Sequence, residues 1–379
     1  MIESIELHHF KCFEDICLPL GPLTLLSGTN AAGKSSCLQA LVLLHQTMRE
    51  HEWSTRLVLN GSAIRLGTVK DVVDKVHGRR HFEISLREPS TSLHWAFAAD
   101  SPNAMTMAVE CVGLNGTQHK RPTYLRHLCV TDPKETSPKL AERLRSLTYI
   151  TAERLGPREV YALEDRQSAS VVGPKGENTV SVLERMRSEP IRPALRIPET
   201  ARTGLRQVEA HMRRFFPGCR LDVQPVPQAN ALTLGIATSD ETGFHRPVHV
   251  GFGITQVLPI IVAALSAEKD GLLLIENPEV HLHPAGQALM GTFLAEVAAA
   301  GTQVILETHS DHVLNGIRRA VRAGTLPHQD ALLHFFRPRG GELDQVESPA
   351  LDADGNVDVW PEGFFDQFDK DMNHFAGWD

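Results

Sequence analysis

Polar and hydrophobic residues alternate near the start of the chain, and short apolar runs follow. Residues 4–9 and 13–18 alternate, which predicts two half-buried strands. Residues 23–27 form an apolar run typical of a buried strand, and residues 36–50 read as a helix without a breaker. The chain therefore opens with strands, a glycine-rich turn and a helix.

The same patterns predict the elements of the remaining chain. Residues 81–130 are expected to be rich in strands, 137–146 to form a short helix and 147–150 a buried strand. Helical pieces are expected within 177–216, strands within 220–250, helices at about 255–267, 285–299 and 311–322, and apolar strands at 271–275 and 303–306. This order predicts an α/β fold.

The turn between the first apolar strand and its helix fits G-x-x-x-x-G-K-[ST], with Gly28, Gly33, Lys34 and Ser35 at the fixed positions. In this context the pattern predicts a phosphate-binding loop, because backbone N–H groups and the helix N-terminus attract phosphate oxygens. Lys34 is expected to reach the β- and γ-phosphates and Ser35 to hold Mg²⁺. The predicted nucleotide ligands in this loop also include Asn30 and Ser36.

A P-loop needs an acid at the end of another strand. Glu276 follows the apolar residues 272–275 and is the expected acid on the Mg²⁺ side. Glu279 is expected either to polarise the attacking water or to cap the following helix. His309 follows the apolar strand 303–306 and is expected to reach the γ-phosphate rather than serve as an ordinary loop residue.

A second glycine-rich turn precedes the Glu276 strand and opens a helix, which is another anion-binding shape. Its candidate ligands are Gly251, Gly253, Thr255 and Gln256. Two phosphate-binding turns in one chain suggest that two copies complete each other's sites. A metal site at His281 and His283 is not favoured, because no further Cys or His cluster lies near them in sequence.

Composition and charge narrow the picture. The 379 residues are 42% hydrophobic and 22% charged, as in ordinary globular proteins, and no apolar run is long enough for a membrane span. No signal peptide is expected, and six cysteines without a C-x-x-C pair favour the cytoplasm. The net charge of −8 means that any nucleic-acid contact has to come from a local patch.

Arginines concentrate in the middle of the chain. Residues 185–220 hold nine of them, which fits either DNA or RNA binding or a solvated or partner-docking face. Arg202, Arg206 and Arg213 have a spacing that could place them on one helix face. Arg154 and Arg158 follow the strand 147–150, so a role near the nucleotide or at a dimer interface is expected.

These motifs, in this order, resemble the ABC-type ATPase heads of the SMC, RecF and OLD (overcoming-lysogenisation-defect) group. Residues 5–13 with the P-loop are similar to their N-terminal lobe, 251–256 to their signature motif, 275–284 to their Walker B and D-loop, and 308–310 to their switch histidine. The segments 152–158, 176–178 and 354–368 further resemble prokaryotic AAA-type ATPases that carry a C-terminal domain of unknown function and end in a WPEGFFDQF-like motif.

The resemblance implies ATP and Mg²⁺ as cofactors, a homodimer or higher assembly that sandwiches ATP, and a separate effector protein from a neighbouring gene. This chain departs from the group where Asn277 follows Glu276, since many heads have a glutamate there, and no Q-loop glutamine can be placed. No coiled-coil arm interrupts the chain, and too few residues follow His309 for an appended toprim nuclease. The acidic tail around Asp369 is interpreted as surface, and residues 352–356 as a hairpin turn.

The sequence thus predicts a P-loop NTPase of ABC-ATPase-head type with an antiparallel β lobe and an inserted helical lobe. The expected core is 1–80, 145–175 and 245–340, the β lobe about 81–135, the helical insert about 177–220 and the C-terminal region 341–379. Two functions are weighed: a slow ATPase that serves anti-phage defence or DNA repair, and a nucleotide-gated scaffold that holds an effector nuclease or toxin with little hydrolysis. The ATPase subunit of a membrane transporter is disfavoured, because a standard signature is missing.

Overall fold

The computed structural model describes residues 1–76, 80–130, 138–164, 172–239, 241–341 and 343–378. The chain divides into two compact units. Unit 1 comprises Met1–Leu147, His328–Asp352 and Asn356–Asp379, and unit 2 comprises Thr148–Pro327 and Ala353–Gly355. Parts of several expected segments lie outside the described residues: 77–79 and 165–171 of the core, 131–135 of the β lobe, the start of the helix 137–146, residue 240 in the strands of 220–250, and residues 342 and 379 of the C-terminal region. The side chain of Asp369, in the acidic tail, lies outside them too.

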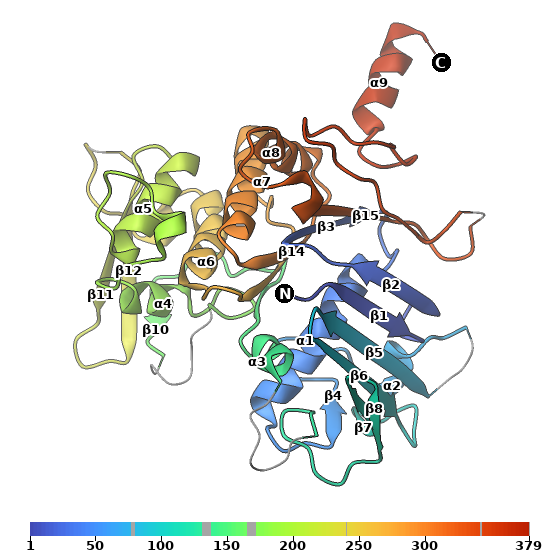
Figure 1. The fold of residues 1–379 in the computed structure, drawn as a ribbon. Coiled ribbons are helices and arrows are strands. Elements are labelled where there is room, and N and C mark those ends of the chain that lie inside the picture. The colour runs from blue at the N-terminus through green and yellow to red at the C-terminus, as the bar shows by residue number, and fades with distance from the viewer. Residues whose placement is uncertain (77–79, 131–137, 165–171, 240, 342, 379) are drawn as a thin grey trace. The chain divides into compact units, whose positions relative to one another are not determined.

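Unit 1 contains both termini and the predicted P-loop (Figure 1). Its elements are β1 (Ser4–His8), β2 (Asp15–Pro19), β3 (Leu23–Gly28), α1 (Lys34–Glu50), β4 (Arg56–Val58), α2 (Val69–Val72), β5 (His81–Glu88), β6 (Thr91–Ala98), β7 (Thr106–Leu114), β8 (Thr117–Lys120), α3 (Lys139–Arg145), η3 (His328–Asp330), β15 (Ala331–Phe336), β16 (Val346–Glu347) and α9 (Gln367–Ala376).

An antiparallel sheet makes up much of unit 1. Within the described residues its strands follow the order β2–β1–β5–β6–β7–β4, with β8 paired to β7. The sheet includes β1, β2 and β4, which precede residue 81, so it draws on more of the chain than the expected β lobe. Alternate residues of β5 and β6 are buried, among them Phe82, Trp95 and Phe97, because one face of the sheet packs against the core.

The P-loop strand β3 lies beside a strand from much later in the chain. β15 pairs with β3 in parallel, with Gly28 opposite Phe336, and β16 pairs with β15 in antiparallel fashion. Residues 23–27 of β3 are all buried, as expected for a parallel strand with both faces covered.

The segment 352–356 forms the expected hairpin turn, in which the backbone N–H of Asp352 donates to the carbonyl of Asn356 at 2.9 Å.

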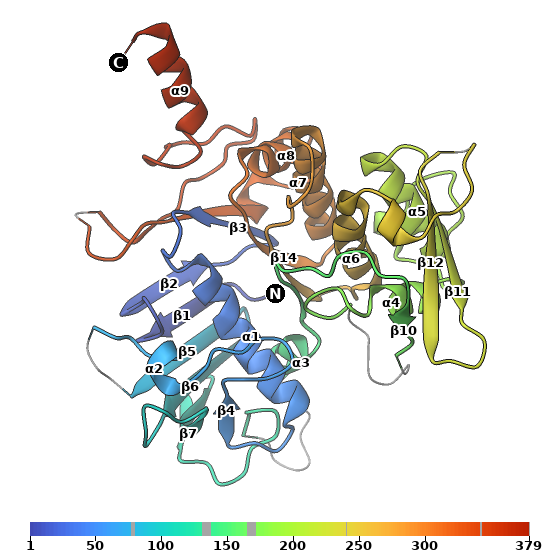
Figure 2. The same ribbon diagram turned by 180° about the vertical axis from the view of Figure 1, so that it is seen from behind.

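Unit 2 combines a parallel sheet with helices and a small antiparallel sheet (Figure 2). Its elements are β9 (Thr148–Ile150), β10 (Tyr161–Ala162), α4 (Thr179–Arg185), η1 (Pro193–Leu195), α5 (Gly204–Phe215), β11 (Arg220–Pro225), β12 (Ala231–Ala237), η2 (Pro247–His249), α6 (Phe252–Ser266), β13 (Leu272–Glu276), α7 (Pro284–Ala299), β14 (Gln303–Glu307) and α8 (Asp311–Arg322).

The parallel strands of unit 2 bring three loops to one sheet edge. β13 pairs in parallel with both β14 and β9, so the segments that follow Ile150, Glu276 and Glu307 leave the sheet at the same side. The helices α7 and α8 pack closely because glycines allow backbone contact. A Cβ on Gly316 would lie 1.9 Å from the carbonyl oxygen of Ala288.

No helix among the described residues is long and apolar enough to cross a membrane.

Candidate functional site

The P-loop of unit 1 needs glycine at both of its fixed glycine positions. Gly28 has a φ of 135°, and a Cβ there would lie 2.2 Å from the carbonyl oxygen of Phe336. Gly33 has a φ of 113°, and its Cβ would lie 2.4 Å from the ring of Phe13 and 2.6 Å from the sulfur of Cys12. These contacts fix the course of the loop and leave its backbone to face a ligand.

The chemistry around this loop fits an anion. The Lys34 ammonium is buried and donates to the carbonyl oxygens of Gly28 at 3.0 Å and Thr29 at 2.8 Å, so the cation is held inside the loop. Ser35 and Ser36 lie in the first turn of α1, a turn without an acidic residue. Asn30 is exposed at the tip of the loop. A cation, two hydroxyl groups and a helix N-terminus together fit a nucleoside triphosphate with a hard metal ion such as Mg²⁺.

In unit 2, the Glu276 carboxylate is held from two sides. The hydroxyl of Tyr149 donates to its Oε1 at 2.7 Å, and the backbone N–H of Ala152 donates to its Oε2 at 3.2 Å. Tyr149 is buried, and burial together with the adjacent carboxylate raises the pKa of its hydroxyl, which therefore stays a donor. Ser35 and Glu276 lie in different units, so their shared Mg²⁺ stays a prediction.

Arg154 forms hydrogen bonds with the loops that follow β9 and β13 at this sheet edge. Its guanidinium donates to the carbonyl oxygens of Thr151 at 3.1 Å, Glu276 at 2.9 Å and Asn277 at 2.8 Å. Burial lowers the pKa of Arg154 to about 10, so it remains a cation at neutral pH. Arg158, the other candidate in this segment, is exposed.

Glu279 and His309 meet at the same edge. The backbone N–H of His309 donates to Oε1 of Glu279 at 3.1 Å, while Oε2 of Glu279 is buried without a hydrogen-bond partner among the described residues. Burial raises the pKa of the Glu279 carboxyl. The cap of α7 is His283, whose Nδ1 accepts from the backbone N–H of Ala285, so the geometry does not support the helix-cap interpretation of Glu279.

The second glycine-rich turn is shorter than the sequence suggests. α6 begins at Phe252, with Gly251 as its N-cap, so Gly253, Thr255 and Gln256 lie within the helix. Thr255 donates to the carbonyl oxygen of Phe252 at 2.9 Å, and Gln256 donates to that of Leu155 at 3.2 Å. The expected helix start at about residue 255 was therefore late by three residues, because no strong breaker separates Gly251 from the apolar run.

His281 and His283 have structural roles here. The His281 ring packs against Phe252, with 4.9 Å between the ring centroids. No group of three or more His, Cys, Asp or Glu residues in the described part of the chain is arranged to hold a metal ion.

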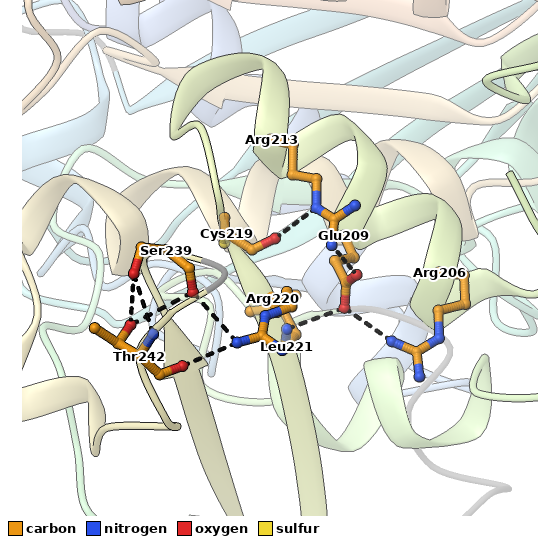
Figure 3. Close-up of polar contacts among 8 residues, drawn as sticks. All are labelled: Arg206, Glu209, Arg213, Cys219, Arg220, Leu221, Ser239 and Thr242. Atoms are coloured by element: carbon orange, nitrogen blue, oxygen red, sulfur yellow. Dashed lines mark hydrogen bonds and ion pairs between the residues drawn. The ribbon is translucent and has the colours of Figure 1, made fainter.

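Most of the arginines within 185–220 are engaged inside unit 2. Glu209 is buried and accepts from Arg206 at 3.0 Å and Arg213 at 2.9 Å, as Figure 3 shows. Arg214 forms a two-pronged pair with Glu296, at 2.6 and 2.7 Å. Hydrogen bonds or ion pairs to neighbouring groups are also made by Arg187, Arg192, Arg196 and Arg220.

The predicted arginine helix face is only partly present. Arg202 precedes α5, which begins at Gly204, so it does not share a helix face with Arg206 and Arg213. Arg206 and Arg213 do lie on one face, but Glu209 lies between them on that face and neutralises part of their charge. These contacts give the stretch a structural function, and nucleic-acid binding there stays a prediction.

Family models match most of the chain in three stretches. Residues 1–105 match an AAA ATPase domain, and residues 142–315 match "AAA domain, putative AbiEii toxin, Type IV TA system". Residues 326–374 match a "Protein of unknown function (DUF3696)". The P-loop lies in the first stretch, and Glu276, Glu279 and His309 lie in the second.

Relatives and solved structures agree with these models. An OLD nuclease of Thermus scotoductus is 25% identical over 330 residues, which cover 82% of this chain and 59% of the relative. The chain thus spans about three fifths of the length of that curated relative. A Pyrococcus furiosus Smc head domain, solved bound to the C-terminal domain of ScpA, matches with a TM-score of 0.57 and 13% identity over 92% of this chain and 96% of that one. An SmcHead bound to the C-winged helix domain of ScpA matches with a TM-score of 0.54 and 13% identity over 93% of this chain and 98% of that one.

The fold is therefore that of an α/β P-loop ATPase head of the ABC type. Together with the ATPase models and the OLD relative, it supports an ABC-like ATPase of the SMC, RecF and OLD type, which confirms the group that the sequence motifs resemble.

Proposed function

We propose that the chain binds ATP with Mg²⁺, pairs with a second copy when ATP is bound, and separates after slow hydrolysis. The observation that carries this proposal is the P-loop, in which two glycines with left-handed backbones surround a buried lysine. The process it would switch is related to nucleic acid, as the OLD relative suggests, and we favour anti-phage defence or DNA repair.

In this proposal Glu276 organises Mg²⁺, and Glu279 and His309 act on the attacking water and the γ-phosphate. Bound Mg²⁺ would supply charge stabilisation at the transferred phosphoryl group. The unsatisfied Oε2 of Glu279 supports a role in orienting water, because a buried carboxylate oxygen without a partner can accept a hydrogen bond from it. Its raised pKa also suits a group that gains a proton during the reaction.

A second candidate function rests on Asn277. Its backbone has a φ of 44°, and its carbonyl is held by Arg154, so the residue that follows Glu276 is an amide in a fixed conformation. An amide cannot serve as a general base. This favours a nucleotide-gated scaffold that holds a separate effector and hardly hydrolyses ATP.

Turnover measurements separate the two functions. We expect wild-type chain to hydrolyse ATP slowly, Glu279→Gln to lose at least tenfold in turnover while keeping ATP binding, and Lys34→Ala to lose both. Glu153→Gln is the matched control, because Glu153 is an exposed carboxylate paired with Lys175 in the same unit. Undetectable turnover of the wild type, even with DNA or RNA added, would reject the enzyme and leave the scaffold.

Pairing is tested separately by measuring mass in solution. Glu279→Gln with ATP and Mg²⁺ is expected to run as a dimer, and the same variant without nucleotide as a monomer. A mass that does not respond to ATP in either the wild type or Glu279→Gln would contradict the dimer proposal.

Tyr149 is expected to position Glu276 for this reaction. Tyr149→Phe removes one of the two donors to the carboxylate, and we expect about a tenfold loss of turnover, since hydrogen bonds to charged groups contribute about 1.5–3 kcal/mol. The magnesium concentration needed for half-maximal turnover should rise as well. Tyr161→Phe is the control, because Tyr161 lies in the same unit and contacts the backbone of Arg158 instead. An unchanged magnesium dependence would mean that Tyr149 has only a packing role.

A further inference from the structure

Two aromatic side chains stand side by side on the surface of unit 1. Trp53 is 53% exposed and Tyr124 is 51% exposed, and their ring centroids lie 5.4 Å apart. The guanidinium carbon of Arg126 lies 5.3 Å from the centre of the Trp53 ring. We call these three residues the aromatic platform. Large rings left exposed beside each other mark a contact surface more often than a single exposed ring does.

The platform is held by a strained and well-anchored turn. His127 and Leu128 both have left-handed backbones, with φ values of 51° and 56°, in a two-residue turn closed by the pair Arg126 and Cys129. The indole N–H of Trp95 donates to the carbonyl oxygen of Leu128 at 2.8 Å, and the Leu128 side chain is buried. Such backbone strain persists only where the surroundings enforce it, and it concentrates at functional sites.

The turn is also joined to the segment that carries Trp53. The backbone N–H of His127 donates to the carbonyl oxygen of Glu52 at 2.6 Å. The Glu52 side chain in turn accepts from Arg126 at 2.8 Å. These contacts connect the turn at residues 126–129 to the segment that carries Trp53, next to Glu52.

Two further cations precede Tyr124 in sequence, and both are exposed. Lys120 ends the strand β8, all of whose residues are exposed, and Arg121 follows with an 82% exposed side chain. Arg121 pairs with Glu110 at 2.9 Å, and Arg126 pairs with Glu52. Exposed pairs of this kind contribute little to stability, so both guanidinium groups can transfer to a stronger anion such as phosphate.

We propose that the aromatic platform binds single-stranded nucleic acid, with unpaired bases stacked on Trp53 and on Tyr124, whose ring planes differ by 41°, and phosphates held by Arg126, Arg121 and Lys120. Aromatic rings interleaved with cations form the chemistry that recognises bases and phosphates together. A duplex is disfavoured, because its base faces are hidden. The arginines of 185–220 are candidate nucleic-acid ligands from the sequence, but most of them are engaged within unit 2, whereas the side chains of the platform are exposed.

Nucleic acid as the class of ligand rests on the proposed function. Binding at the aromatic platform itself requires neither ATP hydrolysis nor dimerisation. Binding is measured on the full chain by fluorescence anisotropy with labelled 20-mers of dT and rU and with a blunt 20-base-pair duplex. We expect at least one single strand to bind more tightly than the duplex and to quench Trp53 fluorescence. The two single strands separate DNA from RNA.

Variants assign the binding to the platform. Trp53→Ala is expected to weaken single-strand binding by about tenfold, and Trp53→Phe to keep most of the affinity while losing the fluorescence quench. Arg126→Ala should weaken binding and reduce its dependence on salt. The matched controls are Trp378→Ala and Arg87→Ala, because these side chains are 80% and 65% exposed elsewhere in unit 1.

The proposal fails if Trp53→Ala binds like the wild type while its ATP binding is unchanged. It also fails if neither 20-mer binds, or if the duplex binds as tightly as both single strands. Loss of ATP turnover without loss of oligonucleotide binding would instead count against the proposed function alone, so the two failures are distinguishable.

Discussion

Arg154→Ala is expected to lower the free energy of unfolding of unit 2 by about 3 kcal/mol and to abolish ATP turnover. The guanidinium satisfies three backbone carbonyls from the loops after β9 and β13. Its removal takes a charged donor away from each of those oxygens and takes a cation that interacts with Glu279 and Glu276 out of the site. Thermal and urea unfolding followed by circular dichroism would measure the loss.

Two further variants help to explain the expected loss of stability and turnover in Arg154→Ala. Arg154→Lys keeps the charge but cannot reach three carbonyls with a planar group, so it should restore only part of the stability. Arg322→Ala removes an exposed arginine in α8 of the same unit and should leave both stability and turnover close to wild type. A stable and active Arg154→Ala protein would contradict the structural role that the contacts assign.

Gly28→Ala is expected to eliminate nucleotide binding. The added Cβ would lie 2.2 Å from the carbonyl oxygen and 2.6 Å from the backbone nitrogen of Phe336, so β3 and β15 would have to separate. The φ of 135° adds a further cost of about 1–3 kcal/mol for any residue with a side chain. Binding of a fluorescent ATP analogue would measure the effect, with circular dichroism reporting the fold.

Gly116→Ala provides the control for backbone strain alone. Gly116 also has a positive φ, of 85°, but a Cβ there meets nothing within 4 Å. It should therefore lose some stability and keep nucleotide affinity. Equal nucleotide affinity of Gly28→Ala and the wild type would show that the P-loop course does not depend on its contact with Phe336.

Local patterns were enough to predict the elements that carry the site. The apolar runs at 23–27 and 272–275 correspond to β3 and β13, and the P-loop and Glu276 follow them as expected. Such runs are informative because buried parallel strands are apolar on both faces. The end of β13 at Glu276 also follows from the pattern, since a carboxylate cannot continue a buried run without a partner.

Partners that are distant in sequence could not be predicted. Tyr149 was visible only as part of a buried strand, and its hydroxyl contacts a carboxylate 127 residues later. The role of Arg154 near the nucleotide or a dimer interface stays a prediction, but the sequence does not show that its guanidinium binds backbone carbonyls of its own unit. A residue's type indicates which groups it can bind, but only the strand order of β9, β13 and β14 determines which groups are adjacent.

The arginine-rich stretch illustrates the same limit. Counting charges along 185–220 gives an excess of arginine, but Glu209 and Glu296 use three of these side chains in ion pairs within unit 2. Conversely, Trp53 and Tyr124 are 71 residues apart in number and carry no shared motif, so their contact emerges only from the fold. The groups that meet on a surface are therefore harder to predict from sequence than the P-loop, which is a local motif.

The residues that pack against the P-loop glycines also limit how far the chain can be truncated. Gly33 is backed by Cys12 and Phe13, and Gly28 by Phe336, although the first ATPase model ends at residue 105. A fragment cut at that boundary retains the complete loop sequence but loses β15, the strand beside β3. Expression of residues 1–105 should therefore yield a polypeptide without nucleotide affinity, and a minimal version of unit 1 has to retain residues 331–336.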